Sequence, residues 1–170
     1  VFSDAKEEFL VDLLQKAHDL VPEADYGSIY LIEEGKINYI DTIGHDLENL
    51  KKLDLKKDNF KINDQDLLIV ENISKQMEID MGVENYNKFQ TASQNMKSSL
   101  LFKLRVNDQW SGGISLDIDE ASEEKFSTEA IETISGFGNL ASAFLTMRSH
   151  RDFQEKFQQE LIMSFIKLLE

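Results

Sequence analysis

The sequence predicts an α+β fold: a central antiparallel β-sheet of five to six strands, with N- and C-terminal helices packed on one face of the sheet. Two observations lead to this prediction. The first and last segments of the chain each carry a continuous apolar stripe at helical spacing. Between them, short segments with alternating polar and apolar residues follow one another. Consecutive strands bounded by helices are typical of an antiparallel sheet with its helices on one side.

The N-terminal helix is predicted from apolar residues that recur at three- and four-residue steps. Ser3 or Asp4 can cap its start, and Glu7 stands three residues after Asp4, as a capping box requires. Pro22, the only proline in the chain, ends the pattern. The stripe that we expect this helix to bury consists of Phe2, Ala5, Phe9, Leu10, Leu13, Leu14, Ala17, Leu20 and Val21.

A first hairpin is predicted directly after this helix. Residues 26–32 and 37–43 are rich in β-branched and aromatic side chains, which favour strands. Residues 33–36 separate them and include Gly35, which can adopt the positive φ that a tight turn needs.

The middle of the chain has less regular patterns. Leu47, Leu50 and Leu53 predict a short helix, and Phe60 with Ile62 predicts a short strand. The apolar run at residues 67–70 predicts a further strand. Residues 73–96 are polar with scattered apolar positions, which we interpret as a mixture of helix and loop.

A second hairpin is predicted from residues 98–106 and 110–118, with its turn at residues 107–109. Side chains alternate between the two faces of a strand. We expect one face to carry Leu100, Phe102, Leu104 and Val106 with Trp110, Gly112, Ile114, Leu116 and Ile118. The opposite face would then carry Ser99, Leu101, Lys103 and Arg105 with Ser111, Gly113, Ser115 and Asp117.

A long final helix is predicted from Ser127 to Glu170. Ser127 is placed as its N-cap, and Phe126 with Ile131 is placed as a hydrophobic staple. The stripe expected to cover the sheet comprises Ile131, Ile134, Phe137, Leu140, Ala141, Phe144 and Leu145.

A second apolar stripe follows on the same helix, made of Phe153, Phe157, Leu161, Phe165 and Leu168. It has no partner left in this chain, and exposed stripes of this kind mark interfaces, here most simply a parallel homodimer. The first residue is not Met and no helix-stop signal precedes the last one. We therefore expect a domain at residues 1–147 and a helix at 148–170 that leads to a further domain.

Composition excludes several classes of function. The chain has 170 residues, a net charge of −14 and no cysteine. The negative charge argues against nucleic acid or an anionic membrane surface as a partner. The lack of cysteine removes disulfides and thiolate chemistry, which fits a cytoplasmic protein. No apolar run reaches the roughly 20 residues of a membrane span.

Four segments resemble the GAF family of sensor domains: residues 26–36, 98–106, 110–117 and 126–132. They are similar to its first hairpin, its ser-leu-leu strand, the returning strand and the start of the last helix. Gly112 and Asp117 stand at the family's usual glycine and final acid, whereas Lys103 stands where the family usually has proline. Residues 161–170 also resemble the helix that leads into bacterial HD-GYP domains, which hydrolyse cyclic di-GMP.

This resemblance implies a GAF/PAS-like ligand cavity on the sheet face away from the terminal helices. The candidate lining residues are Ser28, Tyr30, Tyr39, Asp41, Leu101, Lys103 and Ser115. Lys103 would favour an anionic ligand, because a partly desolvated ammonium attracts a carboxylate or phosphate. Ordinary sheet packing is the alternative for Tyr30 and Tyr39.

No catalytic, metal or cofactor site is predicted. His18, His45 and His150 lack metal spacing and a nearby nucleophile, although His45 lies next to the expected cavity. The acidic run that includes Asp117 and Asp119 lacks calcium-loop spacing and is interpreted as a solvated turn. The family includes a reductase that uses cysteines, and this chain has none.

Three functions remain open at the level of sequence. The first is a cytoplasmic bacterial sensory module that controls a C-terminal output domain, such as HD-GYP, through a dimeric helix. The second is a ligand-free dimerisation domain of the same fold. The third is a small hydrolase with an unrecognised site.

Overall fold

A computed structural model describes residues 4–60 and 65–169. The predictions for Phe2, Ser3 and Ile62 lie outside these residues, as do the side chains of Asp4 and Ala5. Among the described helices, none combines the length and the hydropathy that crossing a lipid bilayer requires.

The elements follow the chain in the predicted order. Helices are α1 (Asp4–Asp19), α2 (Leu47–Leu50), α3 (Ile73–Met81), α4 (Val83–Ala92) and α5 (Thr128–Leu169), with a 3₁₀ turn at Lys57–Asn59. Strands are β1 (Tyr26–Glu33), β2 (Lys36–Ile43), β3 (Leu67–Glu71), β4 (Met96–Val106) and β5 (Gln109–Asp119). A short strand at Phe60 was predicted, but this residue directly follows the 3₁₀ turn instead.

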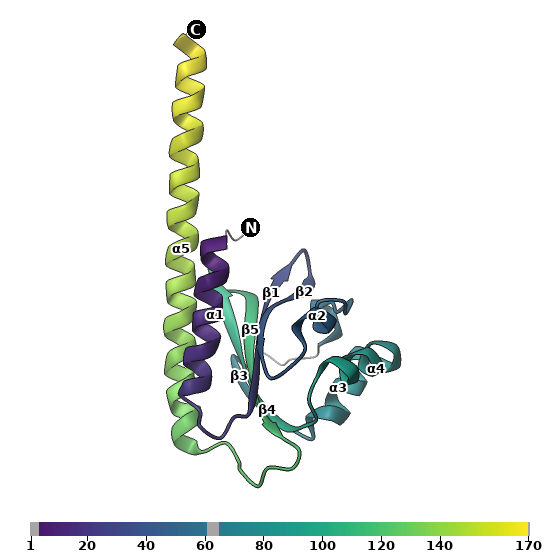
Figure 1. Cartoon of the computed structure of the whole chain (residues 1–170). Coiled ribbons are helices and arrows are strands. Elements are labelled where there is room, and N and C mark those ends of the chain that lie inside the picture. Colours follow the sequence, from purple (N-terminus) through teal and green to yellow (C-terminus); the bar gives the residue numbers. More distant parts are fainter. Residues whose placement is uncertain (1–3, 61–64, 170) are drawn as a thin grey trace.

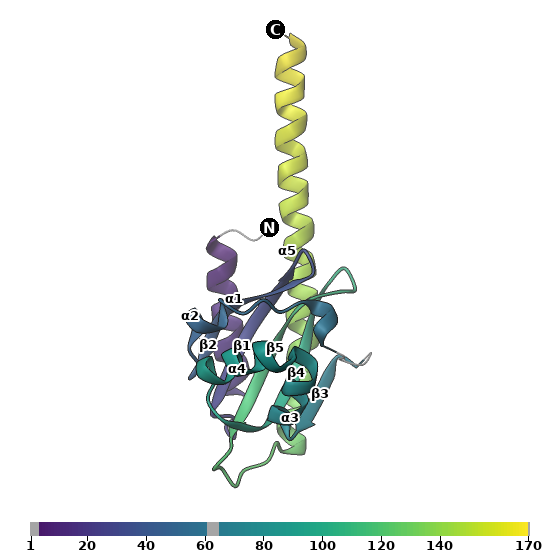
Figure 2. The same cartoon turned by 90° about the vertical axis from the view of Figure 1, so that its right-hand side faces the viewer.

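The five strands form one antiparallel sheet in the order β2-β1-β5-β4-β3. Helices α1 and α5 lie together against one face, and α2, α3 and α4 lie over the other (Figures 1 and 2). The predicted α+β architecture is confirmed. The sheet consequently separates two apolar clusters, one under each helical layer.

The helix-side cluster buries the stripe of α1 and the first stripe of α5. Leu10, Leu14, Ile134 and Leu145 are at most 2% exposed there. Leu20, Leu140 and Phe144 were expected in the same stripes, but they are 40%, 73% and 44% exposed. Each is the immediate neighbour of a buried stripe residue. Because successive residues of a helix are rotated by about 100° from one another, each of these side chains lies at the edge of the buried face or outside it.

The start of α5 follows the predicted capping chemistry. The Ser127 hydroxyl accepts the backbone N–H of Ala130 at 3.0 Å, which satisfies one of the orphan donors of the first turn. The helix then continues for 42 residues, about 60 Å at 1.5 Å per residue. Its C-terminal part extends well beyond the sheet and beyond the described part of α1 (Figure 1).

Two of the three register shifts in the described ladders decide which face the predicted site residues occupy. The register shifts between Ile29 and Tyr30 on β1 and between Leu104 and Arg105 on β4. At the second shift, Trp110 pairs with Arg105. The centroid of the Trp110 ring lies 5.2 Å from Lys103 Nζ, on the sheet face away from α5. The prediction that Trp110 lies among the helix-side residues was therefore wrong. An extra residue in one strand reverses the alternation beyond it.

Candidate ligand cavity

A cavity of about 370 Å³ lies between the sheet and the layer formed by α2, α3 and α4. This volume is within the range of small-molecule sites. Its apolar lining residues include Ile37, Leu50, Phe60, Leu68, Ile69, Val70, Ile73, Met77, Phe89, Met96 and Leu101. Its polar lining residues are Ser28, Tyr30, Tyr39, His45, Glu71, Gln76, Asp80, Ser99, Ser115 and Asp117.

The floor of the cavity is a hydrogen-bond network centred on Asp117. Ser99 and Ser115 each donate a hydroxyl to Asp117 Oδ1 at 2.6 Å. His45 Nε2 lies 2.9 Å from Asp117 Oδ2. The side chains of His45 and Asp117 are 4% and 2% exposed, so this network is shielded from bulk water. Such networks rigidify a site when their members are satisfied.

The partners of His45 determine its tautomer. The backbone N–H of Gln94 donates to His45 Nδ1 at 3.1 Å, so this nitrogen is an acceptor. The ring hydrogen is therefore on Nε2, which donates to Asp117. His45 is neutral in this arrangement, and a proton on Nδ1 would face another donor.

The same geometry bears on the hydrolase alternative. A nucleophilic serine needs a base with a ring nitrogen available to accept its proton. Here both nitrogens of His45 are occupied, and the hydroxyls of Ser99 and Ser115 are directed at Asp117. The residues are those of a catalytic triad, but their connectivity is not that of a nucleophile and its base.

Two tyrosines form an aromatic wall beside this floor. Tyr30 and Tyr39 meet edge to face with ring centroids 6.2 Å apart. Burial raises the pKa of both hydroxyls well above the ordinary tyrosine value, so both stay protonated. The ring of Tyr30 lies over Gly113, where a Cβ would be only 2.5 Å from the Tyr30 hydroxyl. The glycine thus permits the close approach of this wall to the sheet.

A second polar contact, at the first residue of β1, lies beside the turn after β2 that positions His45. The Tyr26 hydroxyl donates to Asp119 Oδ2 at 2.6 Å, which raises the pKa of Tyr26 to about 12 and lowers that of Asp119. The Tyr26 ring lies 5.2 Å from the His45 ring. It also lies beside Gly44, whose φ is +82° and where an added Cβ would overlap the Tyr26 ring.

The structure places five of the seven predicted lining residues on the cavity wall: Ser28, Tyr30, Tyr39, Leu101 and Ser115. Asp41 does not line it, because Asp41 pairs with Ile29, whose side chain packs in the helix-side cluster. Lys103 does not line it either. Its ammonium lies over Trp110, which occupies this part of the sheet face after the register shift.

Sequence reasoning missed three members of the floor network. Asp117 was interpreted as part of a solvated turn, which was wrong, since this residue is 2% exposed within β5. Ser99 was placed on this face but not named as a site residue, and His45 was noted only as adjacent. Alternation along the second hairpin already placed Ser99, Ser115 and Asp117 on one face and was the available signal.

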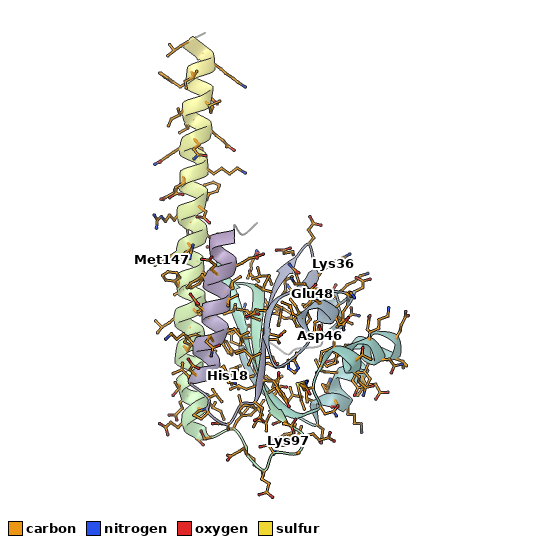
Figure 3. The ribbon with its side chains drawn as sticks, viewed as in Figure 1. His18, Lys36, Asp46, Glu48, Lys97 and Met147 are labelled. Atoms are coloured by element: carbon orange, nitrogen blue, oxygen red, sulfur yellow. The ribbon has the colours of Figure 1, made fainter. Side chains whose placement is uncertain are left out.

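Cations are scarce at this site. None of the described lining residues is Lys or Arg. Figure 3 shows Lys36 and Lys97 near opposite ends of the sheet, and these two lysines bind Asp54 and the carbonyl of Ser122. No group of described His, Cys, Asp and Glu side chains is arranged to hold a metal ion.

Comparison with solved structures gives the fold. A domain assigned to a two-component sensor histidine kinase of Sinorhizobium meliloti 1021 matches with a TM-score of 0.66, at 19% identity over 89% of this chain and 99% of that one. The GAF domain/HD domain protein from Geobacter sulfurreducens matches with a TM-score of 0.65, at 15% identity over 83% and 92%. The blue-light absorbing PixJ GAF-domain from Thermosynechococcus elongatus matches with a TM-score of 0.64, at 14% identity over 94% of both chains.

The chain has the GAF fold. No protein-family model and no curated protein matches its sequence. The resemblance seen in four short segments is thus supported by the arrangement of the whole chain. In this GAF fold the cavity lies under α2, α3 and α4, on the face that the sequence predicted.

Proposed function

We propose that this chain is the sensory module of a signal-transduction protein and binds a small molecule in the cavity under α2–α4. The cavity itself carries this proposal: about 370 Å³ of mainly apolar space, with hydroxyl, imidazole and carboxylate groups meeting at its floor. Apolar pockets with a few convergent polar groups are the usual form of small-molecule sites.

Strand β4 connects this cavity to α5. Ser99 and Leu101 line the cavity, while Phe102 on the opposite face packs edge to face against Phe137 of α5. A Cβ at Gly138 would lie 3.1 Å from the Phe102 ring, so helix and strand are in close contact. A ligand that moves β4 would therefore displace α5.

Hydrogen bonds strengthen this connection near the end of β4. The backbone N–H groups of Arg105 and Asn107 donate to Ser142 Oγ and Thr146 Oγ1 of α5, at 3.0 and 3.2 Å. These bonds fix the position of α5 along β4. In the proposal, α5 transmits the displacement to a C-terminal output domain, such as HD-GYP, in the bacterial cytoplasm.

The C-terminal half of α5 is proposed to form a parallel homodimer. Phe153, Phe157, Leu161, Phe165 and Leu168 are 52–84% exposed, although they are large apolar side chains. Identical stripes at equal height on two parallel helices pack by symmetry. Light scattering tests this arrangement: the chain is expected to be dimeric, and a version truncated at Arg148 monomeric. A monomeric full chain would exclude it.

Ligand binding is tested by thermal-shift screening with a small-molecule library, because a ligand bound only by the folded state raises its stability. A Leu101→Trp variant, which fills part of the cavity, is expected to lose the shift. If no compound stabilises the chain, or the variant responds equally, the cavity is not a ligand site. The ligand-free dimerisation function would then replace the sensory one.

A further inference from the structure

The buried carboxylate of Asp117 carries a charge that no described cation balances. Its side chain is 2% exposed, and its ring partner His45 is neutral because Gln94 N–H occupies the other ring nitrogen. No described lining residue is Lys or Arg. Buried charges in proteins are normally paired, because removing an ion from water is costly.

Two further hydroxyls belong to residues that line the same cavity, and neither makes a hydrogen bond to another described residue. Ser28 and Tyr39 are 7% and 8% exposed, and both line the cavity. Ser28 is directly opposite Ser115 in the β1–β5 ladder, and the Ser115 hydroxyl donates to Asp117. Each of these oxygens can accept a hydrogen bond from a ligand.

The walls and the mouth add two features that favour positive charge. The rings of Tyr30, Tyr39, Phe60 and Phe89 line the cavity, and aromatic faces attract cations by about 0.5 to 2 kcal/mol. The exposed carboxylate of Glu71 lines its edge. The described lining therefore offers a cation both negative charge and aromatic surface.

From these contacts we infer that the cavity binds an organic cation: a protonated amine on an apolar body, with its ammonium group at Asp117, Ser28 and Tyr39. The inference rests on the proposed function of the cavity as a ligand site. An ammonium has three donors and no acceptor, which suits a floor of acceptor oxygens. The sequence favoured an anion because of Lys103, but Lys103 does not line the cavity.

An anion would be disfavoured at the same floor. It would approach the Asp117 carboxylate without a described lysine or arginine to compensate it, and the only imidazole hydrogen is already donated to Asp117. A neutral alcohol could use the hydroxyls of Ser28 and Tyr39 but would leave the carboxylate charge unbalanced. The charge of the ligand is thus the property to test.

The experiment compares matched probes that differ only in this charge. Three scaffolds (indol-3-ylethyl, phenylethyl and hexyl) are each supplied as the primary amine, the alcohol and the carboxylic acid. Thermal shift and calorimetry at neutral pH on the whole chain report binding. At least one amine is expected to raise Tm, with its alcohol weaker by about tenfold or more in Kd and its acid without effect.

Variants then locate the ammonium group. Asp117→Asn keeps the shape of the side chain and removes its charge, and it is expected to raise the Kd of the amine by about 30-fold or more, as for the loss of one partner of a buried charge pair. Tyr39→Phe removes one acceptor and is expected to raise Kd less. Glu132→Gln, an exposed position of α5, is the charge-matched control and leaves Kd unchanged.

The outcomes distinguish failure of the cationic ligand class from failure of the sensory function itself. If Asp117→Asn does not fold, Tyr39→Phe and the wild-type comparison still decide. Binding of an acid or alcohol with equal or greater affinity than its amine overturns the cationic class but leaves the cavity a ligand site. Failure of all nine probes overturns the cationic class, and failure of the library screen as well removes the sensory function.

Discussion

Replacing Gly113 by alanine should push the Tyr30 wall away from the sheet. A Cβ at this position would lie 2.5 Å from the Tyr30 hydroxyl and 2.7 and 3.0 Å from two ring carbons. Close contacts with the hydroxyl oxygen and two ring carbons cannot be relieved by rotating a single terminal group, so the whole ring has to move. The ring would have to move towards the cavity that it lines.

The magnitude follows from two opposing effects. Overpacking a well-filled interior costs about 1 to 3 kcal/mol. Alanine in a strand recovers roughly 0.5 to 1 kcal/mol, because glycine loses more chain entropy on folding. We therefore expect a net loss of about 1 to 2 kcal/mol. For a chain of this size that corresponds to a Tm lower by about 2 to 8 °C.

Urea and thermal unfolding of the variant provide the assay. Gly136→Ala is the matched control: this glycine lies in α5 with no atom within 4 Å of its ideal Cβ, and the change is expected to stabilise by roughly 1 kcal/mol. Adding Tyr30→Phe to Gly113→Ala removes the nearest atom and should restore part of the loss. A Gly113→Ala protein as stable as wild type would refute the close approach.

Three further predictions concern the turn between β2 and α2, the pH dependence of stability, and assembly. Gly44→Ala should destabilise by roughly 2 kcal/mol more than Gly35→Ala. Both glycines have positive φ, but an added Cβ would overlap the Tyr26 ring at Gly44 and would meet no atom within 4 Å at Gly35. Equal urea midpoints for the two variants would contradict this. Tyr26→Phe should lose stability by an amount that is constant between about pH 5 and 9. The stability difference between wild type and variant shrinks as pH falls through the lowered pKa of Asp119, or as pH rises through the raised pKa of Tyr26, about 12. A stability difference that does not depend on pH would exclude the hydrogen bond between them. Phe157→Glu should make the proposed dimer monomeric in light scattering, and an unchanged dimer mass would show that α5 is not the interface.

Local patterns were sufficient for the elements of the fold. The stripe of α1, the capping serine of α5 and the alternation in β4 are properties of spacing and residue type, which a sequence displays directly. The helices of residues 73–92 were predicted only as a mixture, because α3 and α4 are short and partly exposed. Their boundaries depend on packing against the sheet more than on helix propensity.

The sequence did not reveal the register shifts in the strand ladders. One extra residue opposite Ile29 and another near Trp110 change the face on which neighbouring side chains lie. Strict alternation therefore misplaced Asp41 and Trp110, and it gave Lys103 a role in a cavity that it does not line. A bulge is a single insertion in a ladder and leaves no periodic signal.

The sequence by itself determined the α+β class, the strand hairpins, the helical faces and the chemical types that face the cavity, because these depend on periodicity and on residue identity. The tertiary structure decided that Asp117 is buried, that His45 reaches it from a segment 72 residues away, and that Gln94 fixes the tautomer of the ring. These contacts join segments distant along the chain, and no local pattern encodes the distance between them. The charge that the cavity presents to a ligand is therefore a product of the fold.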